Sequence, residues 1–234
     1  PDARAQLKRD FGVDAFDNAA QACSAVDVVM NAVKPQLFRV VCEELSGELN
    51  NARPLIISIA AGITIAQIDR WLGGGHAIVR CMPNTPAMIG AGATGLYAND
   101  ATSDAQRTQA ETILGCAGIT AWIDDETLID VVTAVSGSGP AYFFLLVEAL
   151  ENAGVEEGLP RDIARALAAQ TCMGAGRMLV ESGESPETLR KRVTSPNGTT
   201  HAAVTALETG GLRTLANSAV RAATESGRKL AAQD

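Results

Sequence analysis

The chain of 234 residues has few of the side chains from which metal sites and hydrolytic active sites are built. It contains two histidines, His76 and His201, with no H-E-x-x-H motif and no Cys/His set at ligand spacing. Its five cysteines are odd in number and widely spaced, so they match neither a zinc site nor a disulfide framework. We therefore expect no bound metal, reduced thiols and a cytoplasmic protein.

The chain also lacks an excess of positive charge and long apolar runs. A formal net charge of −8 argues against nucleic acid as a partner, because such a chain does not neutralise a phosphate backbone. No apolar run approaches the roughly 20 residues that a membrane span needs, so no membrane contact is expected. The composition is 47% hydrophobic with only 4% aromatic residues, which suits closely packed helices and α/β layers.

Residues 1–123 alternate between helical and strand patterns. Helical patterns cover residues 2–11, 36–49, 64–72 and 104–114, and strand patterns cover 26–33, 55–59, 77–82, 93–98 and 119–122. Apolar strands between helices predict a mostly parallel, doubly wound sheet covered on both faces. In such sheets ligands bind beyond the carboxyl ends of the strands. We expect this first domain to end at residue 123.

Residues 124–234 carry helical patterns without convincing strands. The patterns cover residues 126–135, 141–153, 161–181, 200–207 and 212–230. The segment 161–181 presents Ala, Gly and Met over much of its surface, which is poorly suited to face water. We expect this all-helical second domain to bury that surface against a second copy of the chain, as a homodimer.

A polar loop of the second domain is the strongest functional signal. Residues 195–198 separate a short helix from a second helix that opens at Thr199-Thr200. The N–H groups of Gly198, Thr199 and Thr200 lack helical partners and lie at the positive end of a helix dipole, which favours a small carboxylate or phosphate. The alternative is a polar turn whose Ser and Thr side chains merely cap the second helix.

Four further segments carry unusual motifs of small residues or proline. They are Ala32-Val33-Lys34-Pro35, Ser58-Ile59-Ala60-Ala61-Gly62, Arg80-Cys81-Met82-Pro83-Asn84-Thr85-Pro86 and Ser136-Gly137-Ser138-Gly139-Pro140-Ala141-Tyr142. Together with the loop at 195–198, their order and spacing resemble the pyrroline-5-carboxylate reductase family over about residues 1–230. The resemblance implies a Rossmann-like domain, here without the first strand and Gly-rich turn of the family pattern, and an all-α dimerisation domain. It also implies reduction of 1-pyrroline-5-carboxylate to L-proline by NADPH or NADH, in homodimers that can assemble into rings.

The resemblance also assigns roles to individual residues. Thr200 is the catalytic hydroxyl that meets the imine nitrogen. The substrate-binding residues are Ser195, Gly198 and Thr199 beside Thr200, with Gly137, Ser138, Gly139 and Pro140 near the nicotinamide. The cofactor-binding residues are Ala32, Val33, Lys34, Pro35, Ala60, Asn84 and Asn18. For Asn84 a turn-forming role is the alternative, and for Asn18 a helix-capping role. Asn197 stands where the family often has Gly, and we expect it to adopt a left-handed backbone.

Two other functions fit parts of the sequence. One is a related hydroxyacid-dehydrogenase-like enzyme or imine reductase, and the other is a non-catalytic, ligand-sensing dimer module. Such dehydrogenases usually take a catalytic lysine from a helix of the second domain, whereas only Lys191 and Lys229 follow residue 122, neither on an apolar helix face. The run from Gly90 to Gly95 fits G-x-G-x-x-G, but a strand and a turn follow it rather than a helix, so we reject it as a cofactor loop.

Overall fold

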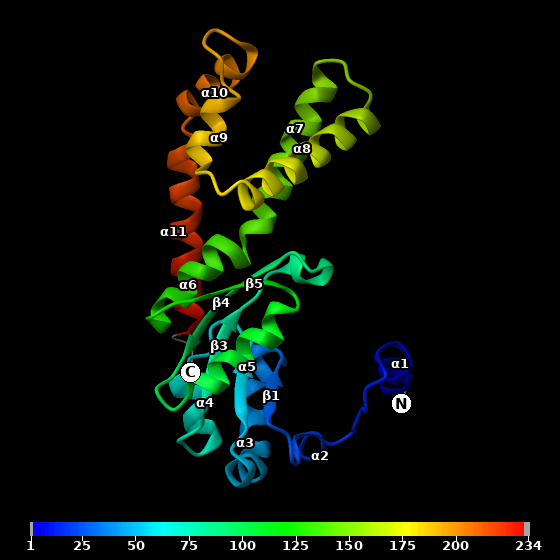
Figure 1. The fold of residues 1–234 in the computed structure, drawn as a ribbon, viewed down its shortest axis with the longest axis vertical. Helices are drawn as coiled ribbons and strands as arrows, with labels where there is room; N and C mark the ends of the chain where they lie inside the picture. Colours follow the sequence, from blue (N-terminus) through cyan, green and yellow to red (C-terminus); the bar gives the residue numbers. More distant parts are fainter. Residues whose placement is uncertain (1, 232–234) are drawn as a thin grey trace. The chain divides into compact units, whose positions relative to one another are not determined.

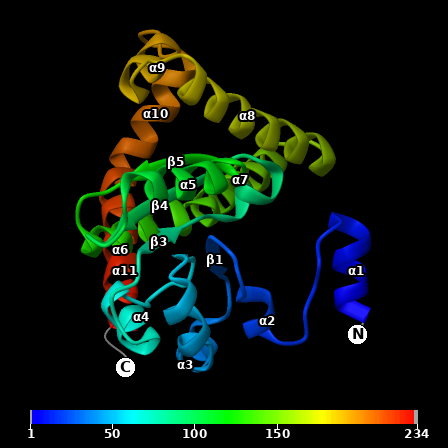
Figure 2. The ribbon, with the colours of Figure 1, turned by 60° about the horizontal axis from the view of Figure 1, so that its bottom comes forward.

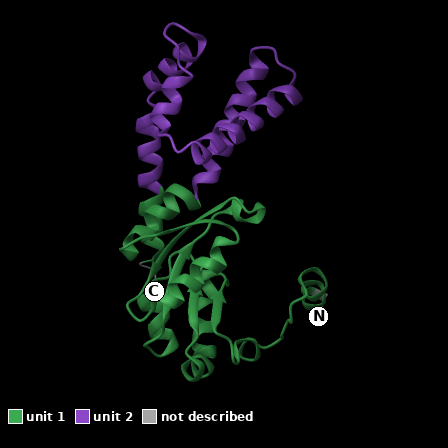
Figure 3. Ribbon diagram, viewed as in Figure 1, with its two compact units in different colours: residues 1–137, 223–234 green, residues 138–222 purple. Residues whose placement is uncertain are grey.

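The computed structural model describes residues 2–231, which fall into two compact units (Figure 3). The first unit contains the chain up to Gly137 and again from Ala223 onward, and the second contains Ser138 to Ala222. The boundary expected after residue 123 lies earlier in the sequence than this division, which falls after Gly137. The reason is that the helical segment which follows residue 125 packs on strands of the first unit.

The first unit is built on a five-stranded sheet in the order β1-β2-β3-β4-β5 (Figure 1). The strands are β1 (Val28–Asn31), β2 (Leu55–Ser58), β3 (Ile78–Met82), β4 (Gly92–Ala98) and β5 (Gly118–Trp122). All neighbouring strands are parallel except β3 and β4, which are antiparallel. The mostly parallel sheet expected from the sequence is therefore confirmed.

Helices cover both faces of this sheet. Those of the first unit are α1 (Asp2–Phe11), α2 (Ala19–Cys23), α3 (Pro35–Ala52), α4 (Ile65–Leu72) and α5 (Asp104–Gly115), with the short helix η1 (Thr85–Ile89) before β4. Leu55 and Ile57 of β2 point into a core with α5, whereas Ile56 points into a core with α3 and α4. Figure 2 shows these helices around the strands. This alternation is the period of two that a strand imposes on its side chains. It explains why β2 is buried along its whole length.

The sequence also determines where two of these helices begin. Thr64 accepts a hydrogen bond from the Gln67 N–H, and the Gln67 side chain accepts one from the Thr64 N–H. Ser103 and Gln106 form the same reciprocal pair at the start of α5. Each pair satisfies two N–H groups at a helix start, which determines the residue at which the helix begins.

After β5 the chain is helical. The short elements η2 (Glu126–Leu128), α6 (Ile129–Val132) and η3 (Thr133–Gly137) complete the first unit, and η3 is a π-helical turn. The second unit contains α7 (Gly139–Glu156), α8 (Arg161–Glu181), α9 (Pro186–Arg192), α10 (Thr199–Thr209) and the first part of α11 (Leu212–Ala231).

Ionic contacts hold the helices of the second unit in pairs. Glu151 of α7 accepts hydrogen bonds from Arg161 and Arg165 at the start of α8, at 3.0–3.1 Å. Glu208 of α10 makes a bidentate contact with Arg213 of α11 at 2.7–3.1 Å. These carboxylates link consecutive helices while leaving most apolar side chains of α7 and α8 exposed.

Candidate functional site

The carboxyl ends of β1, β2 and β3 lie at one edge of the sheet, because these three strands are parallel. Residues 32–35 follow β1, Ala60 follows β2 and Asn84 follows β3. The structure therefore brings three of the segments predicted to bind the cofactor to the same edge of the first unit. This is the place at which open α/β sheets bind ligands.

The segment after β1 leads directly into an open helix start. Asn31 ends the strand with its side chain 8% exposed, and its Oδ1 accepts a hydrogen bond from the Val33 N–H at 3.3 Å. Pro35 opens the 18-residue helix α3, and Lys34 at the N-cap makes no side-chain capping bond. Ala32 and Lys34 are exposed. A helix N-terminus beside an exposed lysine favours an anion, so this segment fits a phosphate-bearing dinucleotide.

The segment after β2 consists of small residues at a tight turn. The buried Ser58 accepts a hydrogen bond from the Ala60 N–H at 3.3 Å, and Ala60 is only 5% exposed. Gly62 has a φ of +75°, and a β-carbon there would lie 3.1 Å from Cβ of Leu230. A turn without larger side chains lets a flat cofactor ring approach the backbone, so this segment also fits the dinucleotide.

Asn84 joins the loop after β3 to two other elements. Its Oδ1 accepts a hydrogen bond from the Ala93 N–H at 2.9 Å, and its Nδ2 donates to the Ser136 carbonyl at 3.1 Å. Asn84 thus fixes the η1 loop to β4 and to the π-helical turn η3. Gly137 ends that turn, and a β-carbon on it would lie 2.9 Å from Cε of Met82. π-helical turns occur frequently at functional sites, but no sequence pattern indicated this one.

Asn18 has a different surrounding from the other predicted cofactor residues. It is the N-cap of α2, where its Oδ1 accepts a hydrogen bond from the Ala20 N–H at 2.8 Å. That contact is the capping alternative stated from the sequence, and the structure records no other polar contact of its side chain.

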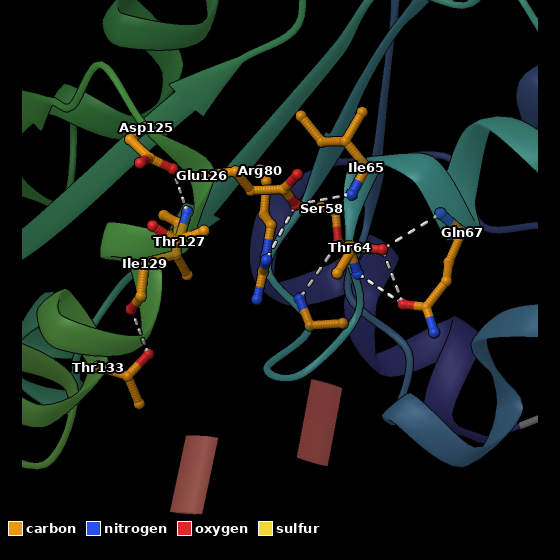
Figure 4. Close-up of polar contacts among 11 residues, drawn as sticks. Ser58, Thr64, Ile65, Gln67, Arg80, Asp125, Glu126, Thr127, Ile129 and Thr133 are labelled. Atoms are coloured by element: carbon orange, nitrogen blue, oxygen red, sulfur yellow. Dashed lines mark hydrogen bonds and ion pairs between the residues drawn. The ribbon is translucent and has the colours of Figure 1, made fainter. Parts of the chain in front are cut away.

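A carboxylate network that no sequence pattern had indicated joins η2 to β3 and to the start of α4 (Figure 4). Oε1 of Glu126 accepts hydrogen bonds from the Ile65 N–H at 2.8 Å and from Nη1 of Arg80 at 2.9 Å. The Arg80 side chain is 4% exposed. A charged residue inside the apolar strand I-V-R-C-M was the available signal, because a buried arginine needs a carboxylate partner.

Asp130 lies one helical turn beyond Glu126 and completes this cluster. Burial raises the pKa of the Asp130 carboxyl, and the charges of Arg80 and Arg228 oppose that shift. Gly227 of α11 packs so closely that a β-carbon on it would lie 2.9 Å from Oδ1 of Asp130. The cluster therefore connects β3, η2, α6 and the end of α11 within the first unit.

The loop of the second unit has the backbone geometry expected of an anion site. Asn197 adopts a φ of 59°, which confirms the left-handed conformation expected for it. Gly198 is the N-cap of α10, and its N–H donates to the Ser195 carbonyl at 3.1 Å. No side chain caps α10, and Thr199 and Thr200 are exposed. The alternative in which Ser and Thr side chains merely cap the helix is therefore wrong for this structure.

The structure brings Ser195 directly against the start of α10. A β-carbon on Gly198 would lie 3.1 Å from Oγ of Ser195, so the hydroxyl occupies the space that a larger residue would need. Ser138 and Pro140 also belong to the second unit, at the start of α7, whereas Gly137 and the predicted cofactor residues belong to the first. The predicted cofactor residues thus all lie in the first unit, whereas the predicted substrate residues are divided between the two units.

An apolar cavity of about 360 Å³ lies in the first unit between β4, β5 and the helical segment that follows β5. Its walls include Gly95, Ile119, Leu128, Val132 and Val135. Gly95 is the last glycine of the run from Gly90 that imitates a cofactor fingerprint, and it packs closely here. A β-carbon on Gly95 would lie 2.6 Å from Cγ1 of Val132. Close packing explains this glycine, and the rejection of the fingerprint agrees with its place inside β4.

The cysteines form no disulfide, and within residues 2–231 no group of three His, Cys, Asp or Glu side chains is arranged to hold a metal ion. Burial raises the pKa of Cys42 and that of Cys81 to about 12. These two thiols stay protonated at neutral pH and are poor nucleophiles.

We expected no apolar run long enough to span a membrane, but the helical segment from Glu126 to Glu156 differs from that expectation. By length and composition alone it is long and apolar enough to cross a membrane. Glycine, serine and proline at its centre interrupt the apolar residues, so no single apolar run in the sequence indicated it. Its second half carries exposed Phe143, Phe144 and Leu145, and α8 exposes Leu167 and Met173. Monomers rarely expose an apolar surface of this kind, which marks a contact site.

Comparisons with known proteins cover both units. Residues 126–230 match the family described as pyrroline-5-carboxylate reductase dimerisation, and residues 1–62 match the one described as NADP oxidoreductase, coenzyme F420-dependent. The chain is 48% identical to the pyrroline-5-carboxylate reductase of Pseudomonas aeruginosa, over 98% of this chain and 84% of that one. It is 39% identical to the enzyme of Escherichia coli, over 98% of this chain and 85% of the other.

Two solved structures agree with these similarities. The pyrroline-5-carboxylate reductase of Coxiella burnetii superposes with a TM-score of 0.95 at 43% identity, over 98% of this chain and 85% of that chain. The pyrroline carboxylate reductase of Plasmodium falciparum, solved with NADP bound, gives a TM-score of 0.84 at 29% identity, over 95% and 84% of the two chains.

Proposed function

The chain belongs to the pyrroline-5-carboxylate reductase family, and on this premise we propose that it reduces 1-pyrroline-5-carboxylate to L-proline with NADPH or NADH. The observation that carries the proposal is the uncapped start of α10, where Gly198 supplies no side chain and Thr199 and Thr200 are exposed. A site with open N–H groups and hydroxyls suits a small, anionic cyclic imine.

The substrate carboxylate binds at the start of α10. The N–H group of Thr199 and the hydroxyl of Ser195 are the donors we assign to it. The N–H of Gly198, which the family resemblance also assigns to the carboxylate, already donates to the Ser195 carbonyl. The helix dipole adds a favourable interaction with a negative charge, worth about 0.3–1 kcal/mol at an exposed site. The left-handed Asn197 supports this arrangement, because it turns the chain so that Gly198 can begin the helix.

We assign the imine nitrogen to the hydroxyl of Thr200. A cyclic imine is basic enough to be protonated near neutral pH, so the reaction needs no buried histidine or carboxylate at this atom. The hydroxyl positions the nitrogen and relays its proton, which is a role of orientation rather than of strong acid catalysis.

NADPH or NADH supplies the hydride that reduces the C=N carbon. We propose that residues 32–35 and Ala60 form the edge on which this dinucleotide lies, with the open start of α3 near its phosphates. Asn84 holds the η1 loop in place through Ala93 and Ser136. Gly137 and the following residues Ser138, Gly139 and Pro140 are assigned to the nicotinamide side.

Replacing Thr200 by alanine tests the catalytic assignment. We expect kcat/KM for pyrroline-5-carboxylate to fall by about tenfold to a thousandfold, the range for a lost positioned donor or proton relay. Thr200→Ser keeps the hydroxyl and should retain most of the activity. Thr205→Ala is the matched control, since Thr205 is also exposed on α10 but lies beyond its first turn. Equal turnover by Thr200→Ala and Thr205→Ala would remove Thr200 from the mechanism.

The protein is a homodimer, as its dimerisation region implies. We propose that the exposed apolar side chains of α7 and α8 form this contact, so that the apolar segment Glu126–Glu156 meets a second copy rather than a membrane. Assembly of dimers into rings is the further step implied by the family resemblance. Five unpaired thiols favour a reducing compartment, and we propose the cytoplasm.

A further inference from the structure

Glu126 connects two elements that are far apart in the sequence. Its Oε1 accepts hydrogen bonds from the Ile65 N–H at 2.8 Å and from Nη1 of Arg80 at 2.9 Å (Figure 4). Ile65 is the first residue of α4, so its N–H has no partner within the helix. A carboxylate at this position satisfies that N–H and interacts favourably with the helix dipole.

Each of the two elements adjoins a segment that we assign to the dinucleotide site. Helix α4 begins immediately after the turn that contains Ala60 and Gly62, at the end of β2. Glu126 opens η2, which continues through α6 into η3 and ends at Gly137. One carboxylate oxygen therefore holds the start of α4, next to the Ala60 turn, and the helical segment that leads to Gly137.

Arg80 makes this link sensitive to the charge of Glu126. The Arg80 side chain is 4% exposed, and its Nε has no hydrogen-bond partner among the described residues. The other charged groups that act on this cluster are Asp130 of α6 and Arg228 of α11. Loss of Glu126 would leave the buried guanidinium with the partly buried Asp130 as its remaining carboxylate, so Arg80 and the start of α4 would have to move.

We propose that Glu126 is a positioning residue for dinucleotide binding, acting through the start of α4 on the Ala60 turn. This inference rests on the proposed function, because it assigns the dinucleotide to that turn. Glu126 itself does not touch the reacting atoms. Its contribution is to keep the Ala60 turn and the segment leading to Gly137 at a constant separation.

The neighbouring Asp125 offers a matched control. Its Oδ1 accepts a hydrogen bond from the Thr127 N–H at 2.8 Å, so it also caps a helical element, but the contact stays within η2. The experiment measures the NADPH dissociation constant by calorimetry and the urea midpoint of unfolding for Glu126→Ala, Glu126→Gln and Asp125→Ala. The KM values for NADPH and for pyrroline-5-carboxylate are measured in parallel.

Glu126→Ala should raise the dissociation constant and the KM for NADPH by about tenfold to a hundredfold, which is the effect expected when a binding element is misplaced by a distant mutation. The KM for pyrroline-5-carboxylate should stay unchanged. Glu126→Gln should recover only part of the affinity, because its amide oxygen can accept both hydrogen bonds but carries no charge to balance the buried Arg80. Asp125→Ala should bind NADPH like the unmodified protein. If Glu126→Ala does not fold, Glu126→Asp replaces it, since the shorter side chain cannot reach both donors.

Two results separate this inference from the proposed function. If the unmodified protein reduces the substrate and Glu126→Ala binds NADPH as tightly as Asp125→Ala, the positioning role is refuted and the activity stands. If the unmodified protein neither binds NADPH nor reduces the substrate, both the inference and the proposed function are overturned.

Discussion

Replacing Gly95 by alanine should destabilise the first unit by about 1–3 kcal/mol, the usual cost of an added methyl group in a packed core. Gly95 lies in β4 where α6 packs on the strand. A β-carbon there would lie 2.6 Å from Cγ1 and 2.9 Å from Cγ2 of Val132. Carbon atoms pack best at about 3.5–4.0 Å, so the new methyl group must separate β4 from α6 or change the Val132 rotamer.

The assay is urea unfolding followed by tryptophan fluorescence. The chain has two tryptophans, Trp71 and Trp122, and both belong to the first unit, so the signal reports that unit alone. Gly47→Ala is the control, because Gly47 lies within α3, has no positive φ, and a β-carbon added to it would meet no atom within 4 Å. It should stabilise the same unit by about 0.5–1 kcal/mol, through the better helix propensity of alanine.

The two substitutions should therefore shift the urea midpoint in opposite directions. Equal midpoints for Gly95→Ala and the unmodified protein would refute the packing argument. A loss of NADPH affinity by Gly95→Ala with no change in its midpoint would instead favour a cofactor role for the run from Gly90 to Gly95.

Three further outcomes follow from burial and charge. Ala169→Glu, on the exposed surface of α8, should give monomers or insoluble protein, because it would bury an unpaired charge in the proposed dimer contact. Ala105→Glu, on the exposed surface of α5, is the control and should stay dimeric when both are compared by sedimentation. Burial lowers the pKa of His76 below its ordinary value of 6.5, with the charge of Arg53 acting in the same direction. As the pH falls, the unfolded chain therefore takes up a proton at this histidine before the folded one, so the free energy of unfolding should fall below pH 6.5. His76→Gln should remove this dependence of the free energy of unfolding on pH. The same dependence in His76→Gln and in the unmodified protein would contradict this. Iodoacetamide at pH 8 should modify the exposed Cys116 first, as followed by mass spectrometry of the intact protein. Cys42 and Cys81 should stay unmodified, because burial raises the pKa of each thiol to about 12. Early labelling of either buried thiol would contradict the packing.

Local rules were sufficient for the elements of the fold. The apolar run from Leu55 predicted β2 within one residue, and the helical pattern over residues 64–72 predicted α4 within one residue. The left-handed backbone of Asn197 was predictable because asparagine tolerates that conformation. In each case the relevant interactions lie within a few residues in the sequence, so periodicity and side-chain type contain the information.

Contacts between distant residues were not accessible in the same way. The pair of Arg80 and Glu126 joins residues 46 positions apart, and nothing in either local sequence specifies the partner. The antiparallel pairing of β3 with β4 and the π-helical turn η3 likewise depend on tertiary packing. The boundary after residue 123 stays a prediction. That the compact first unit continues to Gly137 could not be predicted in the same way, because helical periodicity does not show that α6 packs on the sheet.

The distribution of perturbed groups agrees with a reductase that works by positioning. The groups assigned to the substrate are backbone N–H groups and the hydroxyls of Ser195 and Thr200, which do not titrate near neutral pH. The shifted pKa values of His76, Asp130 and Cys81 belong to side chains buried in the packing of the first unit. In the second unit, the lowered pKa values of Glu151 and Glu208 come from ion pairs with arginines of the following helix. In enzymes that use general acids or bases, such shifts gather at the reacting atoms. Here the cofactor brings the reactive electrons, so the protein's contribution is geometry. We therefore expect contacts that maintain geometry, such as those of Asn84 and Glu126, to influence the reaction without touching the reacting atoms.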